Sequence, residues 1–322
     1  MNFLTAVAAE GNRFFFGWEI ALMEWLQANL GSGAVSFLSQ LSMFGEELML
    51  IVVMGFFYWV YDKEIGKYIG LSFLAANVWG PMIKNVARRL RPYFCSDRID
   101  LLRLVDTGAD KYDVAAQGYS FPSGHSAGSA TVYGSTARCL KKKWVTFLAF
   151  LLPLLVGVSR VVVGAHYPTD VLAGWALGLL AIFLIPWLRK KIKNRWIFYA
   201  VLILSALPGF FFCTSTDYFS SFGMLIGFVL AEPFEEKYVN FENTRNPIRA
   251  VLRIVGGGAV YFGLNTLLKL PFPKELLDAG DFTAHLIRTG RYAIVIFAVI
   301  AIYPMLFKVT AKIGRKKTEE AA

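Results

Sequence analysis

Long uncharged stretches alternate with short clusters of charged residues along most of this 322-residue chain. Hydrophobic residues make up 56% of it and charged residues only 17%, whereas a soluble domain carries about 25% charged residues. A helix needs roughly 20 apolar residues to cross a bilayer, and several stretches approach that length. Backbone polar groups inside lipid must be satisfied within the segment, which favours helices. The pattern therefore predicts an all-α integral membrane protein with many crossings.

The apolar runs are bounded by aromatic residues or by charge clusters, as is typical of membrane-spanning helices. We expect them at residues 48–61, 68–83, 123–137, 144–159, 171–188, 196–213, a shorter run ending at 231, 254–268 and 292–307. Run 123–137 is rich in small residues, which predicts a span buried inside a helix bundle. Residues 13–30 contain Glu19 and Glu24, so they form either an interfacial helix or a poor first span.

Basic residues divide the loops between these runs into two sets. Basic clusters at 63–67, 141–143, 189–195 and 245–253 and in the C-terminal tail fall on alternate loops, which the positive-inside rule places in the cytoplasm. Loops 84–121, 159–170, 214–220 and 271–290 then share the outer face of a cell (inner) membrane. The loop 84–121 breaks the rule because it carries many arginines, and anion binding is a natural reason.

Composition excludes several other classes. The net charge of +10 lies mainly between apolar runs, where it anchors loops or binds anionic groups, and no basic, aromatic-interleaved polar segment predicts nucleic-acid binding. Cys95, Cys139 and Cys213 form no CxxC pair, so neither a metal site nor a disulfide framework is expected. The first ten residues lack the basic region of a cleavable signal peptide. We expect an N-terminal segment 1–45, a catalytic core 46–190 and an extension 191–322 with a basic cytoplasmic tail.

The candidate site residues lie at ends of spans that are predicted to share the outer face. They are Lys84, Arg91, Ser123, Gly124, His125, Arg160, His166 and Asp170. Lys84 and Arg91 are seven positions apart, about two helical turns, which predicts that both lie on one side of a helix end. Ser123 and Gly124 begin a predicted helix, whose free N–H groups and dipole suit a phosphate.

These residue types together predict phosphoryl transfer. Three cations, Lys84, Arg91 and Arg160, would neutralise the phosphate oxygens, with hydrogen bonds from Ser123 and Gly124. His166 would attack phosphorus and form a phosphohistidine. Asp170 would hold the other ring nitrogen of His166, and His125 would protonate the leaving oxygen and then activate water. No three metal ligands cluster in the sequence, so the cations would take the place of a metal and no cofactor is expected.

Simpler interpretations exist for each residue type. Lys84, Arg88, Arg89 and Arg91 could be anchors at the membrane edge, and for Arg88 and Arg89 this stays open. Arg160 and Asp170 could form a structural ion pair, although ionisable groups near a bilayer are usually functional. His285 lies in the loop 271–290 with no motif, so we expect a solvated side chain.

The three segments together resemble the signature of the type 2 phosphatidic acid phosphatase (PAP2) superfamily, which is shared with vanadium haloperoxidases. The pattern K-x6-RP, PSGH and SR-x5-H-x3-D is met at Lys84, Arg91, Pro92, Pro122, Ser123, Gly124, His125, Ser159, Arg160, His166 and Asp170. The resemblance covers about residues 46–190 and implies metal-free hydrolysis through a phosphohistidine. It also implies a six-helix core whose first helix lies at 13–30. The remaining part, about four further spans, resembles longer bacterial members and loosely the sphingosine-1-phosphate phosphatases.

The expected function is hydrolysis of a lipid phosphate or diphosphate at the outer face, with the bilayer and the lipid as partners and the oligomeric state open. Undecaprenyl diphosphate is the first candidate substrate. Phosphatidylglycerophosphate, phosphatidic acid and sphingoid-base phosphates follow. A lipid phosphotransferase is the second class and a non-enzymatic lipid-phosphate transporter the third. Intact His125, His166 and Asp170 argue against the transporter, because transport needs no nucleophile.

Overall fold

The computed structural model describes residues 11–103 and 108–307, which are helical apart from loops and one isolated bridge between Asn12 and Arg89. The α-helices in chain order are α1 Gly17–Asn29, α2 Ser32–Leu41, α3 Glu47–Phe56, α4 Lys63–Ala87, α5 Pro92–Cys95, α6 Val114–Gln117, α7 Gly124–Leu140, α8 Lys143–Val162, α9 Pro168–Lys191, α10 Arg195–Ala206, α11 Thr216–Phe234, α12 Pro247–Leu267, α13 Lys274–Asp278 and α14 Phe282–Phe297. The predicted basic tail and the first ten residues lie outside these ranges.

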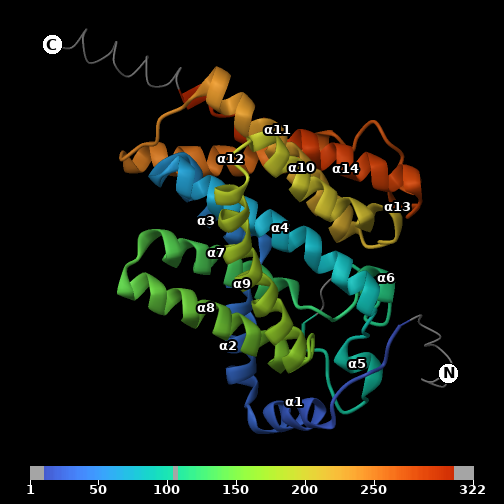
Figure 1. Cartoon of the computed structure of the whole chain (residues 1–322). Coiled ribbons are helices and arrows are strands. Elements are labelled where there is room, and N and C mark those ends of the chain that lie inside the picture. Colours follow the sequence, from blue (N-terminus) through green and yellow to red (C-terminus); the bar gives the residue numbers. More distant parts are fainter. Residues whose placement is uncertain (1–10, 104–107, 308–322) are drawn as a thin grey trace.

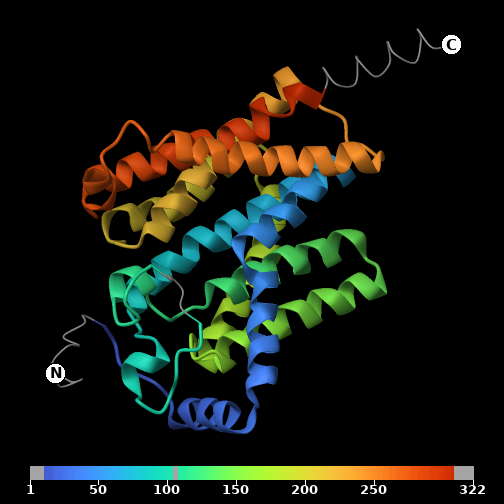
Figure 2. The same ribbon diagram turned by 180° about the vertical axis from the view of Figure 1, so that it is seen from behind.

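Helix α4 separates two groups of helices, as both views show (Figures 1 and 2). On one side α7 packs against α4, α8 and α9, and on the other side α11 packs against α4 and α14, with α12 against α14 and α3. The helices of the extension therefore form a second layer against α4 and α3.

Helices α8, α9, α12 and the segment Phe282–Phe307 are long and apolar enough to cross a membrane, within the described ranges. A further candidate is the pair Ser32–Gly45 and Glu47–Tyr61, which is bent by 46°. Helices α4 and α7 are also long, but α7 buries polar residues such as Ser126, Ser129 and Thr131. Its small side chains allow neighbouring helices to approach closely, and its surface faces protein rather than lipid.

Helix α1 has 13 residues, which span only about 20 Å at 1.5 Å per residue. The hydrocarbon core is about 30 Å thick, so α1 is too short to cross it. Of the two interpretations of residues 13–30, the structure favours the one without a crossing, and the first core helix expected there is not a span. Glu19 of α1 is fully buried and contacts Thr169 in the first turn of α9.

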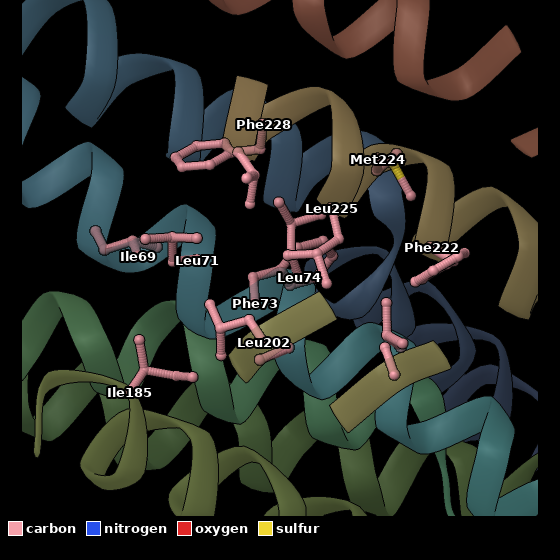
Figure 3. Packing of buried hydrophobic residues seen from close by; sticks show 14 of the residues in the cluster. Ile69, Leu71, Phe73, Leu74, Ile185, Leu202, Phe222, Met224, Leu225 and Phe228 are labelled. Carbon is pink, nitrogen blue, oxygen red and sulfur yellow. The ribbon is translucent and has the colours of Figure 1, made fainter. Parts of the chain in front are cut away.

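The largest apolar cluster joins the two layers (Figure 3). Phe73 and Leu74 of α4 meet Leu225 and Phe228 of α11, with Leu202 of α10 alongside. Lipid tails are as apolar as these side chains, so close packing rather than removal from water stabilises such an interface. The extension is thus packed onto the core through α4.

Several helix ends gather at one end of the bundle. Glu47 at the start of α3, Lys84 near the end of α4 and Gly124 at the start of α7 line one cavity, together with Thr214 before α11 and Gly280 before α14. Loops that the charge pattern grouped on one face therefore lie together in space.

Candidate active site

The cavity at this end has a volume of about 650 Å³. Six of the eight predicted site residues line it, namely Lys84, Arg91, Gly124, His125, Arg160 and His166. Ser123 lines a smaller adjoining cavity of about 200 Å³, which shares Lys84 and Gly124 with the first. Asp170 lies behind His166 and is fully buried. The structure thus brings all eight residues to one place.

His166 lies in a tight turn between α8 and α9. The amides of Ala165 and His166 both donate to the carbonyl of Arg160, at 3.1 and 3.2 Å. Gly164 has a φ of +77°, and a Cβ there would lie 2.2 Å from the carbonyl oxygen of Asp100. Only glycine fits this position, so the turn fixes where the imidazole points.

The two nitrogens of His166 face different surroundings. Nδ1 lies 3.6 Å from Oδ2 of Asp170 and 3.5 Å from Oγ of Ser120. Nε2 lies 3.4 Å from Nη1 of Arg91 at the cavity wall. Asp170 also accepts from the hydroxyl of Ser120 and from the amide of Tyr167, the latter at 2.8 Å. This arrangement favours the tautomer with the proton on Nδ1, which leaves the lone pair of Nε2 directed into the cavity.

Arg91 reaches the cavity by a different route from the predicted one. Helix α4 ends at Ala87, and Arg88 adopts a left-handed conformation with φ 49°. Arg91 therefore lies beyond the helix, and the prediction of two turns along one helix face was wrong. Its guanidinium is held by the carbonyls of Gln117 and Ala165, at 2.7 and 2.9 Å.

The start of α7 is tied to the start of α9. The amide of Ser123 donates to the carbonyl of Asp170 at 2.9 Å, and its Oγ caps the helix by accepting from the amide of Ser126 at 3.4 Å. Gly124 is exposed to the cavity and His125 follows it. The free N–H groups at this helix start are suited to an anion.

The two other cations at the cavity lack anionic partners within the described part of the chain. Arg160 is 2% exposed and its Nε has no hydrogen-bond partner there. Lys84 takes part in none of the ion pairs between described residues, although it lines both cavities. A buried cation without a partner is costly, so both are suited to receive an anionic ligand.

The charge around His166 affects its protonation. Burial lowers the pKa of its imidazole well below 6.5, and the nearby charges of Arg91, Arg160 and Lys84 lower it further. The ring is therefore neutral near pH 7 and keeps a lone pair for attack.

Sequence reasoning missed three residues behind the site. Ser120 and Arg89 both contact Asp170, and Glu19 contacts Arg89. The sequence left open whether Arg89 is an anchor at the membrane edge or binds an anion. In the structure it is buried and pairs with Glu19 and Asp170. The sequence contains one signal that could have identified Glu19, namely that it is an acidic residue within an otherwise apolar helix.

The extension also contributes to the cavity. Residues 214–217 line it, and Asp217 lines the adjoining cavity as well. The predicted core 46–190 therefore does not form the cavity alone, because the fold brings the start of α11 beside Lys84. His285 was also misplaced, since it belongs to α14 and its ring stacks on Phe219 with centroids 3.8 Å apart.

Metal-ligand side chains do not cluster at the site. Within residues 11–103 and 108–307, no group of three or more His, Cys, Asp or Glu side chains could hold a metal ion. Lys84, Arg88, Arg91 and Arg160 line the cavity, and so do the carboxylates of Glu47 and Asp217.

Comparisons with known proteins show the family of this chain. The PAP2 superfamily matches residues 66–194, and the transmembrane extension of PAP2 superfamily phosphatases matches residues 219–316. Phosphatidylglycerophosphatase B of Bacillus subtilis is 35% identical over 157 residues, which cover 46% of this chain and 70% of the relative. Undecaprenyl-diphosphatase of Sulfolobus acidocaldarius is 32% identical over 170 residues, which cover 52% and 77%.

A crystal structure of a transmembrane PAP2-type phosphatidylglycerolphosphate phosphatase from Bacillus subtilis is also similar. It shares 28% identity and a TM-score of 0.45, and the match covers 60% of this chain and 94% of the other.

Proposed function

From the premise that this chain belongs to the PAP2 superfamily of membrane phosphatases, we propose that it hydrolyses a lipid phosphate through a phosphohistidine on His166, without a metal ion. One observation carries the proposal. Nε2 of His166 faces a cavity that is lined by Lys84, Arg91 and Arg160, with Arg88 also at its wall, and Nδ1 lies 3.6 Å from Oδ2 of Asp170.

In the first step the lone pair of Nε2 attacks the terminal phosphorus, and the bond from this phosphorus to the leaving oxygen breaks. The leaving group is the lipid alcohol for a monophosphate and the lipid monophosphate for a diphosphate. Lys84, Arg91 and Arg160 hold the equatorial oxygens, with the amide of Gly124. His125 donates a proton to the leaving oxygen. The positive charge that develops on His166 is stabilised by the carboxylate of Asp170.

In the second step His125 takes a proton from water, whose oxygen attacks phosphorus. The bond between phosphorus and Nε2 breaks, and inorganic phosphate leaves with both histidines restored. Attack by an alcohol instead of water would give a phosphotransferase.

For the substrate we propose undecaprenyl diphosphate first, with phosphatidylglycerophosphate as the main competitor. The names of the two relatives above support both. We also propose that the cavity opens on the outer face and that the C-terminus is cytoplasmic. Support comes from the charge pattern, since the loops at the opposite end of the bundle include Lys141, Lys142 and Arg195.

The test is phosphate release by the purified protein in detergent, with EDTA present. The substrates are undecaprenyl diphosphate, phosphatidylglycerophosphate, phosphatidic acid and sphingosine-1-phosphate. His285→Ala is the matched control, because His285 lies outside the cavity. Release that persists in EDTA and in this control, but is lost in His166→Ala, supports the proposal.

Two outcomes would contradict it. Loss in EDTA that a divalent cation restores would overturn the metal-free step. Full activity of His166→Ala would overturn the nucleophile. The intermediate is checked by quenching a single turnover at high pH and locating the phosphoryl group on the peptide that contains His166.

A further inference from the structure

A buried arginine lies directly behind the catalytic carboxylate. Nη1 of Arg89 donates to Oδ1 of Asp170 at 2.7 Å, while Oδ2 of Asp170 is the oxygen that faces His166. The guanidinium also lies over the ring of Tyr167, 3.9 Å from its centroid. Arg89 is 6% exposed, so its charge acts in surroundings of low dielectric.

Glu19 of α1 holds the other side of this guanidinium. Its Oε2 accepts from Nη2 of Arg89 at 2.6 Å. Its Oε1 accepts from the hydroxyl of Thr169 at 2.5 Å and from the amide of the same residue at 3.2 Å. Glu19 is 0% exposed, although neighbouring residues of this short helix are exposed to the surroundings.

The charges explain what such an arrangement can do. A neutral pair of Arg89 and Asp170 alone would leave little negative charge to stabilise a positive ring on His166. A second carboxylate shares the cation, so the buried group of Glu19, Arg89 and Asp170 carries one net negative charge. That excess matches the positive charge which His166 gains when it is phosphorylated.

We propose that Glu19 is a positioning residue for the reaction, which acts through Arg89 to orient Asp170 and to leave the negative charge of Asp170 only partly compensated toward His166. The inference rests on the phosphohistidine mechanism proposed above. It also assigns a task to the N-terminal helix, which does not cross the membrane but docks one carboxylate against the site.

The main experiment compares Glu19→Gln with Glu24→Gln. Glutamine keeps the shape and removes the charge. Glu24 lies on the same helix and pairs with the exposed Arg98 at 3.2 Å, so it is a matched control. We expect Glu19→Gln to lower kcat about 10- to 100-fold, the usual effect of residues that support a catalytic ligand, with KM within about twofold. Glu24→Gln should keep both constants.

Coupling separates this role from a structural one. If Glu19 acts only through Arg89, Glu19→Gln combined with Arg89→Gln should lose little more than Arg89→Gln alone. Arg89→Lys keeps the charge but cannot contact both carboxylates with one planar group, and should also lose kcat. It tests the chain of contacts even if Glu19→Gln does not fold.

Several results would overturn the inference. These are a wild-type kcat in Glu19→Gln or in Arg89→Lys, additive losses in the double variant, or a loss confined to KM. Failure of the proposed function is seen separately, because the wild-type protein would then release no phosphate and form no adduct on His166.

Discussion

Helix α4 carries one lysine near each end, Lys67 buried and Lys84 half-buried, and the two have opposite surroundings. Lys67 contacts Glu64, Glu232 and Glu236 at 2.8, 3.2 and 2.9 Å. Lys84, near the other end, lines the catalytic cavity and forms no ion pair within the described residues. The comparison teaches that buried charge alone does not mark an active site. The feature that points to the proposed active site is a cation, Lys84, that has no anionic partner within the described residues.

The two ends also differ in how their networks are completed. Around Lys67, Arg195 contacts both Glu232 and Glu236, and Tyr199 donates to Glu232 at 2.7 Å, so the network joins α4, α10 and the end of α11. The network behind Asp170 instead ends on His166, whose second nitrogen faces the cavity. The first network is expected to serve stability and the second to serve chemistry.

The largest expected effect is at His166. His166→Ala should reduce phosphate release by at least about 10³-fold, because no other group supplies the nucleophile. The thermal unfolding midpoint should stay close to that of the wild type, since the side chain lies at the cavity wall. If His166→Ala kept phosphate release within tenfold of the wild-type rate, His166 would not be the nucleophile, and the contrast between the two ends of α4 would fail.

Arg160→Met should be next in size. Loss of a cation that faces the developing charge is expected to lower kcat about 10²- to 10³-fold. Because the variant removes a buried charge without a partner, the free energy of unfolding should rise by about 0.5–2 kcal/mol. Denaturation in detergent measures this, with Arg138→Met, an exposed arginine on α7, as the control. A destabilised variant would show that Arg160 is held by structural contacts instead.

Lys67→Met tests the opposite end. It leaves the buried carboxylate of Glu232 with only Arg195 and Tyr199 as partners, and should lower the free energy of unfolding by up to about 3 kcal/mol. The kcat of the folded fraction should not change. Lys142→Met, at an exposed position between α7 and α8, is the control. A reduced kcat with unchanged stability would mean that the two ends are coupled.

The smallest expected effect is on pH dependence. Attack needs neutral His166, so kcat/KM should fall as pH drops through the pKa of this group in the free enzyme. Burial and Arg91 place that pKa below 6.5. The acid limb that His166 sets in the pH profile should therefore be centred below pH 6.5. An acid limb centred above 6.5 would contradict the electrostatics described here.

Much of the fold follows from local pattern. Apolar runs predicted most of the long helices, because a segment in lipid has only itself to satisfy its backbone. The motif residues were predicted to lie together, and a histidine followed four positions later by an aspartate at a helix start does bring the two side chains within 3.6 Å. Residues 13–30 were ambiguous because hydropathy does not report which side of a helix is buried.

By itself the sequence determined the membrane class, the helix positions and the eight residues that meet at the site, because each depends on neighbours along the chain. Only the tertiary structure decided that Arg91 reaches the cavity from a loop, that Glu19 and Arg89 support Asp170, and that residues 214–217 of the extension complete the cavity wall. Glu19 and Asp170 are far apart in sequence, and no local periodicity records that Arg89 contacts both of them. Such contacts exist only because helices packed around α4 bring distant charged side chains within hydrogen-bond distance.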